Sequence, residues 1–344
     1  MARVRVAVTG LLGALAAAGA CSNDRAPSES TGDGTLPAPG PIPAVAVFVA
    51  GEESGSITLI DGGADTIVAR IPVGARPGGI RATPGGDTLL VALSGASEEG
   101  RNGIGIVDVA ARRLVGILPG GSSPRAFDRT SDGARLIVSN GTADSASIVD
   151  VPGGSVVYAT GVGRGASGVG IEPSGASTWI IGETDGDVTV LDTRSGCILG
   201  RVPVGRAPRD LLFSADGRVA YIAAEGDGSV AVVDARARTV LRTIILPAGS
   251  RPMGLALSPA GDRLFVANGS AGSVSVIDTR TDSLLASVAV GGEPRSIGIS
   301  ADGRKLYTAN GASGEVVVVD AAALRVIRRI PTGAFSSGVA VTAR

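Results

Sequence analysis

Residues 294–333 read PRSIGISADGRKLYTANGASGEVVVVDAAALRVIRRIPTG. In this stretch SIGIS and KLYTA flank an Asp-Gly turn, EVVVVD follows a glycine-rich loop, and VIRRIP ends the unit. Short runs of β-branched residues separated by turn residues are typical of β-strands. Four strands in about 40 residues make one blade of a β-propeller. The stretch therefore predicts a four-stranded antiparallel blade.

The same unit recurs along the chain. An Asp closes the third apolar run of each unit, and successive ones lie 42 to 47 residues apart, at Asp61, Asp108, Asp150, Asp192, Asp234, Asp278 and Asp320. Because a short carboxylate can accept backbone N–H groups, we expect each Asp to stabilise the turn that follows its strand.

The two ends of the repeat region complement each other. The first unit starts at its second strand, VAVFVA (45–50), and the chain ends with an extra first-type strand, SGVAVTA (337–343). Together these pieces make one blade, so three N-terminal strands and one C-terminal strand would close the ring without an open edge. The sequence therefore predicts an all-β fold, a seven-bladed β-propeller over residues 44–344.

Two stretches carry a family resemblance, LFVANGSAGSVSVIDTRTDSLLASVAVGGEPRSIGIS (264–300) and LYTANGASGEVVVVD (306–320). They resemble the YVTN-type β-propeller repeats of bacterial and archaeal surface or periplasmic proteins. They do not resemble WD repeats, because the sole tryptophan, Trp179, is not followed by Asp. The resemblance implies fold relatives such as lactonase-like propellers, the haem d1 domain of nitrite reductases and the N-terminal propeller of nitrous-oxide reductase. A shared fold does not carry an activity.

The N-terminus has the features of an export signal. In residues 1–20, Arg3 and Arg5 precede an apolar run that is too short to span a bilayer comfortably. The run ends in Ala-Gly-Ala before Cys21, which resembles the lipobox of bacterial lipoproteins, and this resemblance makes Cys21 the lipid attachment site. Ala18 departs from the Leu that the lipobox prefers, and the alternative is an ordinary secretory peptide with a chance cysteine.

Residues 21–43 are rich in Ser, Gly and Pro and contain few residues that could enter a core. We expect a disordered tether between the lipid and the propeller. Ser22 after the cysteine favours, by resemblance, sorting to the outer membrane. The predicted location is the cell envelope, at the outer membrane or on the periplasmic side, with membrane contact only through the lipid.

Composition excludes several kinds of chemistry. The chain has no histidine, which removes the commonest general base and the commonest haem and zinc ligand. Lys and Arg number 31 against 32 Asp and Glu, so no bulk positive field attracts nucleic acid. We expect no cofactor, no metal and no nucleic-acid partner.

The second cysteine, Cys197, lies in an apolar run and is predicted to be a buried thiol. The chain has only two cysteines, so no intramolecular disulfide is available if Cys21 is lipidated.

Binding residues are expected on one face of the ring, which we call the arginine face. The first strand of each blade starts on this face and the second strand ends there. Arg125, Arg209 and Arg295 follow the proline at the start of three first strands, where they could hold a carboxylate or phosphate. The two loop insertions, residues 94–103 and the two extra residues before Pro252, lie on the same face.

The ends of the second strands add further polar residues to this face, namely Asn140, Asn268, Asn310, Glu183 and Glu225. Two interpretations stay open. The residues form a binding site, or the acids and arginines pair across neighbouring blades while each Asn-Gly sequence forms a tight turn with positive φ.

One pair of charges lies within the innermost strands. Arg81 and Asp128 hold equivalent positions in adjacent blades, where the other five units carry small or apolar residues. We expect an ion pair between the two blades, with a ligand site as the alternative.

The leading hypothesis for function is a non-enzymatic envelope lipoprotein, a monomer that binds a protein or glycan of the envelope through the arginine face. No set of catalytic residues is recognisable. The alternative is a lactone hydrolase of the lactonase-like propeller type, with Glu183 or Glu225 as base beside Arg209. A haem or copper role is a third hypothesis, which the absence of histidine disfavours.

Overall fold

The computed structural model describes residues 40–74, 76–83, 85–95, 102–333 and 335–343, all within one unit, Leu36–Arg344. The predicted signal peptide, Cys21 and nearly all of the predicted tether lie outside the described residues, as does most of the insertion at residues 94–103. Among the residues that the structure describes, no helix is long and apolar enough to cross a membrane.

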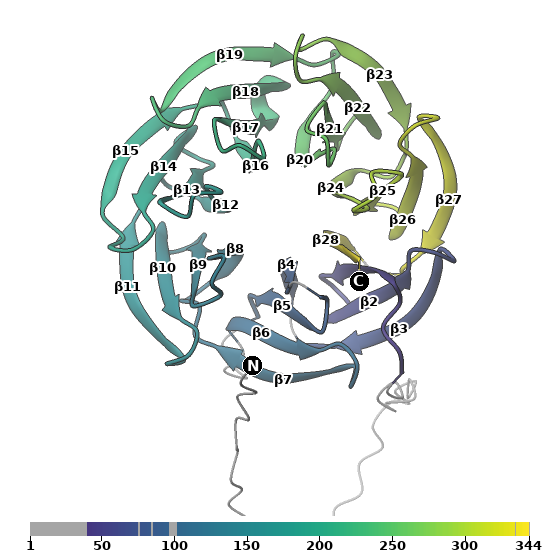
Figure 1. Cartoon of the computed structure of the whole chain (residues 1–344), viewed down its shortest axis with the longest axis horizontal. Helices are drawn as coiled ribbons and strands as arrows, with labels where there is room; N and C mark the ends of the chain where they lie inside the picture. The colour runs from purple at the N-terminus through teal and green to yellow at the C-terminus, as the bar shows by residue number, and fades with distance from the viewer. Residues whose placement is uncertain (1–39, 75, 84, 96–101, 334, 344) are drawn as a thin grey trace, which may run out of the picture. The chain divides into compact units, whose positions relative to one another are not determined.

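Seven four-stranded antiparallel sheets follow one another around a ring (Figure 1). The innermost strands are β28 (Ser336–Ala343), β4 (Pro77–Ala82), β8 (Pro124–Arg129), β12 (Ala166–Ile171), β16 (Pro208–Phe213), β20 (Pro252–Leu257) and β24 (Pro294–Ile299). The second strands are β1 (Val45–Gly51), β5 (Thr88–Leu93), β9 (Arg135–Asn140), β13 (Ser177–Gly182), β17 (Val219–Ala224), β21 (Arg263–Asn268) and β25 (Lys305–Asn310).

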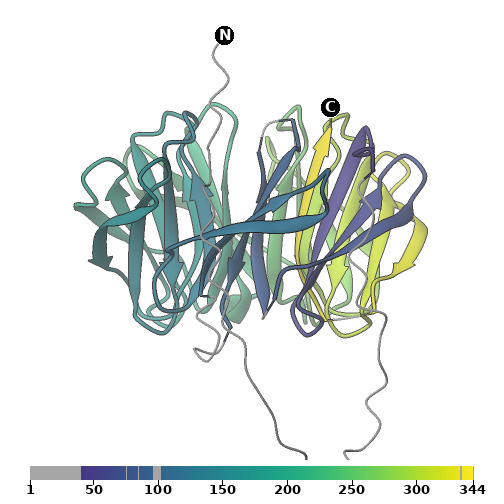
Figure 2. The ribbon, with the colours of Figure 1, turned by 90° about the horizontal axis from the view of Figure 1, so that it is seen from below.

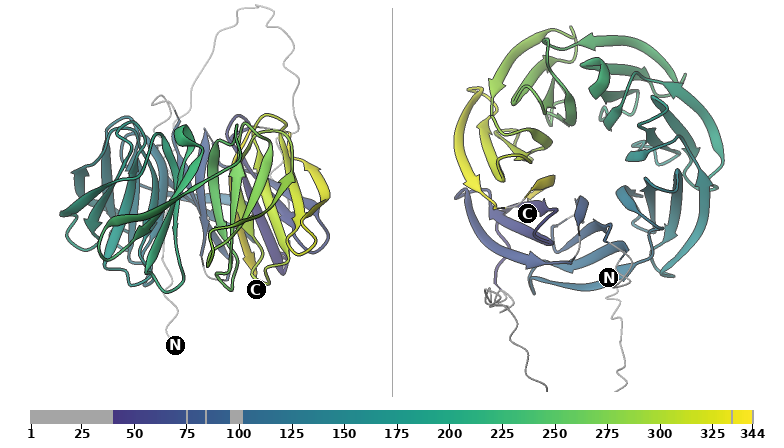
Figure 3. Two further views of the ribbon diagram at one scale, coloured as in Figure 1. Left: turned by 90° about the horizontal axis from the view of Figure 1, so that it is seen from above. Right: turned by 180° about the vertical axis from the view of Figure 1, so that it is seen from behind.

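The third strands are β2 (Ser56–Asp61), β6 (Gly103–Asp108), β10 (Ser145–Asp150), β14 (Asp187–Asp192), β18 (Ser229–Asp234), β22 (Ser273–Asp278) and β26 (Glu315–Asp320). The outer strands, which follow the rim in Figure 3, are β3 (Thr66–Pro72), β7 (Arg113–Leu118), β11 (Ser155–Gly161), β15 (Ile198–Pro203), β19 (Thr239–Ile245), β23 (Leu284–Ala289) and β27 (Arg325–Pro331). We number the blades from blade 1 (β28-β1-β2-β3) to blade 7 (β24–β27) in chain order.

Blade 1 combines the two ends of the repeat region, as the sequence predicts. Strand β1 pairs with β28 in an antiparallel register that sets Phe48 opposite Ala340. Blade 7 is also fastened to blade 1, because Lys305 Nζ donates to Gly62 O and pairs with Asp65 Oδ2, both at 2.8 Å. The predicted seven-bladed propeller, closed by three N-terminal strands and one C-terminal strand, is confirmed.

The apolar core lies between neighbouring blades. The second and third strands of each blade are almost wholly buried, as in β13 and β14, whereas most residues of the outer strands are exposed, as in β11 and β15. Trp179 of blade 4 meets Phe213 of blade 5 edge to face, with ring centroids 5.4 Å apart. The innermost strands approach closely, since a Cβ at Gly254 would lie 3.0 Å from Arg295 O in the next blade.

The seven repeated Asp residues stabilise turns as predicted. Each accepts a backbone N–H from a residue two or three positions later. At the end of β26, Asp320 Oδ1 accepts from Ala322 N at 2.9 Å and from Ala323 N at 2.8 Å. Donors from the backbone favour the ionised carboxylate, and they hold the pKa of Asp320 below its usual range.

The prediction for Cys197 is wrong. Its side chain is exposed, immediately before the outer strand β15, where Ile198 and Leu199 are exposed as well. An outer strand packs on the ring through only part of its surface, so an apolar run at this position does not imply burial.

Asp320→Asn tests the turn acids. Because the pKa of Asp320 is lower in the folded protein than in the unfolded chain, its stabilising effect is present above the unfolded pKa and is lost as pH falls through the folded pKa. The substitution should lower the melting temperature at pH 7 and have little effect near pH 2, where the wild-type carboxyl is protonated too. An equal decrease at both pH values would contradict this electrostatic role.

Candidate functional site

The starts of the innermost strands and the ends of the second strands share one face of the ring, as expected for strands that run between its two faces (Figure 2). Pro124 at the start of β8 is paired with Asn140 at the end of β9. This pairing brings Arg125 over Gly141, where an added Cβ would lie 2.6 Å from Arg125 Nε. Glycine at this position leaves room for the arginine.

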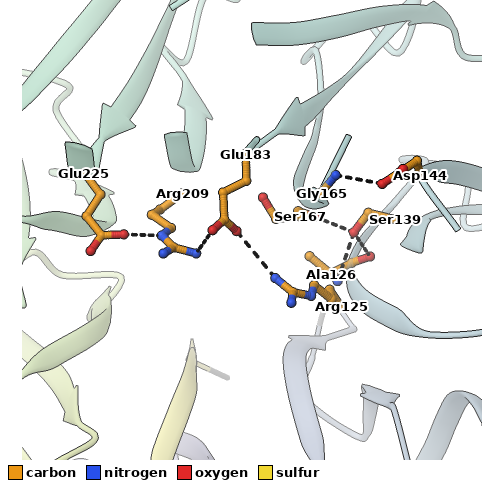
Figure 4. A network of polar contacts seen from close by, with 9 residues as sticks. All are labelled: Arg125, Ala126, Ser139, Asp144, Gly165, Ser167, Glu183, Arg209 and Glu225. Atoms are coloured by element: carbon orange, nitrogen blue, oxygen red, sulfur yellow. Dashed lines mark hydrogen bonds and ion pairs between the residues drawn. The ribbon is translucent and has the colours of Figure 1, made fainter. Parts of the chain in front are cut away.

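A chain of alternating charges crosses this face (Figure 4), and we call it the charge ladder. Glu183 bridges two blades, since its Oε2 lies 3.5 Å from Arg125 Nη1 and its Oε1 lies 2.6 Å from Arg209 Nη1. Glu225, in the 3-10 turn η2 (Glu225–Asp227), then pairs with Arg209 Nε and, at 2.5 Å, with Arg251 Nη2. Pairing across neighbouring blades, one of the two interpretations left open by the sequence, therefore occurs in blades 3 to 6.

The members of the charge ladder differ in how fully they are paired. Glu225 is only 6 % exposed, so its charge depends on Arg209 and Arg251, and loss of a partner from a buried pair is strongly destabilising. The side chain of Arg125 is 53 % exposed, and its one ion pair within the described ranges is the 3.5 Å contact with Glu183. Exposed pairs of this kind contribute about 0–1 kcal/mol. Arg209 is thus a structural member, whereas Arg125 keeps donors for another partner.

Arg295 lies apart from the charge ladder. Its guanidinium lies 4.3 Å from the ring centroid of Phe335, and its Nη2 donates to Glu293 Oε1 at 3.0 Å. A groove of about 960 Å³ opens beside Arg295 and Phe335. The Glu52–Arg76 ion pair, 2.6 Å long, also lines this groove.

The three asparagines are not surface residues, and placing them on the binding face was wrong. Their side chains are buried; Asn140 and Asn268 donate to Ser147 and Ser275 in their own blades, and Asn310 donates to Gly291 O. They therefore fix strand ends and cannot contact a ligand on the surface.

The tight-turn interpretation of the Asn-Gly pairs is wrong too. The left-handed residue of each loop comes later, at Asp144, Gly272 and Gly314.

A cavity of about 450 Å³ occupies the central channel, and all seven innermost strands contribute to its lining. Arg125, Arg209, Arg295 and Glu183 reach it from the arginine face, and Arg81 lines it as well. The cavity brings together side chains from blades 2, 3, 4, 5 and 7, so the ring closure described above is what forms it. Within the described ranges, no group of three or more Cys, Asp or Glu is placed to hold a metal ion.

The expected ion pair between Arg81 and Asp128 is present, at 3.9 Å between Arg81 Nε and Asp128 Oδ1. The closer contacts of Asp128 are with the backbone. Its Oδ1 accepts from Arg129 N and its Oδ2 from Ile171 N in the next blade, both at 2.9 Å. Asp128 therefore joins two innermost strands mainly through hydrogen bonds.

Asp210 is a channel residue that sequence reasoning missed. Its carboxylate accepts from Leu211 N and, in the next blade, from Leu255 N, both at 2.9 Å. Burial raises the pKa of Asp210, while the charge of Arg81 and these N–H donors oppose the shift. The sequence alone could have identified Asp210 as an exception, because the equivalent positions in the other six blades carry only Gly, Ala or Ser.

The profile of the YNCE-like beta-propeller family matches residues 171–343, which is half of the chain. The chain belongs to this family. A search of curated proteins found no match. The YNCE-like match and the ring of seven blades agree on the fold.

Solved structures resemble this YNCE-like propeller at low identity. Hydrazine synthase from Kuenenia stuttgartiensis is 20% identical with a TM-score of 0.70, covering 85% of this chain and 99% of that one. A functionally unknown protein from Desulfotomaculum acetoxidans is 16% identical with a TM-score of 0.74, over 87% and 99%. A candidate 6-phosphogluconolactonase from Bacteroides fragilis is 15% identical with a TM-score of 0.72, over 87% and 98%. These likenesses show the fold alone.

Substitutions at Asp128 and Arg81 separate the two roles of this pair in the YNCE-like propeller. Asp128→Ala should lower the free energy of unfolding by about 1–3 kcal/mol, because Ile171 N loses its acceptor. Arg81→Ala should cost less than about 1 kcal/mol, because it removes a long, half-exposed ion pair and a hydrogen bond to the adjacent Ile80 O. Urea denaturation of both variants measures the difference, and equal losses would show that the ion pair is the dominant contact.

Proposed function

We propose that this protein is a lipid-anchored envelope protein that binds a partner carrying acidic groups, a protein or glycan of the envelope, through its arginine face and without catalysis. The charge ladder is the observation that carries the proposal. It holds three arginines against two glutamates, so it has a net positive charge on a protein whose formal net charge is −1.

The most exposed arginines of the charge ladder lie at its two ends. The side chains of Arg125 and Arg251 are 53 % and 57 % exposed, whereas that of Arg209 between them is 29 % exposed. A fixed row of charges on a rigid ring favours electrostatic selection of an oppositely charged surface. The inner pairs hold the row in place, and the outer arginines meet the partner.

The alternative of a lactone hydrolase assigned Glu183 or Glu225 as the base. Both oxygens of Glu183 face guanidinium groups, of Arg125 and of Arg209. Both oxygens of Glu225 do the same, with Arg209 and Arg251. A general base needs a free oxygen within reach of the proton that it removes. The observed pairing thus favours a structural and binding role for these carboxylates.

The proposed anchor rests on Cys21 and the apolar run before it. Cys21→Ser should abolish incorporation of labelled palmitate and move the protein from the membrane fraction to the soluble fraction of cells. Retention of the variant in the membrane fraction would rule out a lipid on Cys21 as the anchor.

Crosslinking in intact cells tests the proposed binding face. The Arg125→Ala, Arg251→Ala double variant should lose a crosslinked envelope component that the wild type captures, because both exposed ends of the charge ladder are removed. Since Arg251 also pairs with the buried Glu225, circular dichroism must show that the variant is folded. The matched control is Arg218→Ala, Arg280→Ala, which removes two exposed arginines from the opposite face. Capture that survives the first variant, or is lost equally in both, would contradict the proposal.

A further inference from the structure

One hydroxyl in the channel has no partner in the protein. Ser167 is buried, and its Oγ has no hydrogen-bond partner in the part of the chain that the structure describes. It lines the channel cavity together with Arg125 and Glu183 (Figure 4). A buried hydroxyl without a partner is costly, so a ligand in the cavity that accepts a hydrogen bond from Ser167 Oγ would remove this cost.

Arg125 supplies donors beside this hydroxyl. Its guanidinium has five N–H donors, and its contact with Glu183 is a single long one of 3.5 Å. Glu183 is held more closely by Arg209, at 2.6 Å. An oxyanion in the cavity can therefore accept from Arg125 without breaking the charge ladder.

Arg81 is a second cation on the same cavity. Its Nη1 donates to the backbone of Ile80 at 3.1 Å, its nearest carboxylate lies 3.9 Å away, and its side chain is 49 % exposed. Its charge also opposes the rise that burial causes in the pKa of Asp210, three blades further round the ring. Along its strand Arg81 is three residues further from the arginine face than Arg125 is, about 10 Å.

The charge of the lining selects a doubly charged ligand. Four arginines line the cavity, namely Arg81, Arg125, Arg209 and Arg295, against the carboxyl groups of Glu183 and Asp210. Counted over the lining side chains alone, cations exceed carboxyl groups by two. Arg209 and Arg295 are closely paired with Glu225 and Glu293 outside the lining. Arg125 and Arg81 have only long ion pairs, at 3.5 and 3.9 Å, so these two are the cations available to a ligand. The volume of about 450 Å³ is within the range of small-molecule sites, which is about 300–1,000 Å³.

We propose that the channel binds a small organic dianion, with one anionic group held by Arg125 and Ser167 at the arginine face and the second held by Arg81 deeper in the channel. The inference goes beyond the macromolecular partner of the arginine face and requires no such partner, although Arg125 takes part in both. Asp128 lines up β8 and β12, the two strands that carry Arg125 and Ser167, through its hydrogen bond to Ile171 N.

Isothermal titration calorimetry of the full-length protein in detergent tests the proposal. Glutarate, a flexible dicarboxylate, should bind saturably with one site per chain. Ser167→Ala and Arg81→Ala should each weaken glutarate binding about tenfold, because each removes a hydrogen bond to a charged group. Butyrate, with one carboxylate, should bind more weakly and lose affinity only with Ser167→Ala. Arg206→Ala is the matched control, since it removes an exposed arginine that is paired with Asp227 outside the channel cavity.

The outcomes are decisive in both directions. Absence of saturable glutarate binding, or binding that neither Ser167→Ala nor Arg81→Ala changes, would overturn the proposal. If inorganic phosphate binds more tightly than glutarate, and its affinity is the same in the wild type and in Arg81→Ala, the placement of two separate anionic groups is overturned. Circular dichroism and melting temperature check that both variants are folded. Arg125 takes part in both proposals, but Ser167 and Arg81 are unaltered in the crosslinking variant and neither is expected to change crosslinking, so the two experiments can fail separately.

Discussion

The pairing of β28 with β1 is the interaction on which the rest of the structure depends. Blade 1 exists only when the two ends of the repeat region meet, and β28 provides one of the seven walls of the channel. Closure also places Val339 N within 3.2 Å of Ser296 Oγ in blade 7. An open arc of blades would expose two sheet edges and leave the cavity without a wall. The site on this molecule is therefore a property of the closed ring and of no single blade.

Close approach of the innermost strands explains both the stability and the chemistry of the channel. Where the side chains are small, as at Gly254, neighbouring backbones almost touch. Where an acid replaces the small residue, as at Asp210, its carboxylate accepts a backbone N–H from the next blade. The carboxylate of Asp210 therefore joins two neighbouring blades and also lines the channel. Loss of such a carboxylate is therefore expected to affect stability and the channel lining together, whereas substitution of Arg125, at the exposed end of the charge ladder, should leave stability nearly unchanged.

The sequence was sufficient to predict the architecture because the blade length can be measured directly from the spacing of the repeated residues. The spacing of the Asp residues predicted seven blades, and the incomplete units at the ends predicted the closure. Contacts between blades were harder to predict, because a position in a repeat does not say which neighbour a side chain meets. Asn268 is a turn residue by sequence but is buried, and Cys197 lies in an apolar run but is exposed on the rim. Asp210 could have been found by comparing its column across blades, since an acid among small residues is an exception that the period itself reveals.

The arginine face is asymmetric, and this asymmetry bears on how a partner would bind. The charge ladder occupies blades 3 to 6, where each glutamate is shared between two arginines. Beyond it, Met253 packs over Gly269, and Arg295 lies against Phe335, so the ionic row gives way to partly apolar surface. A propeller of identical blades would present the same surface in seven orientations. Because this ring carries charge on one arc and apolar side chains on another, a partner with acidic and apolar parts can match it in one orientation only, and specificity then follows from geometry as well as from charge.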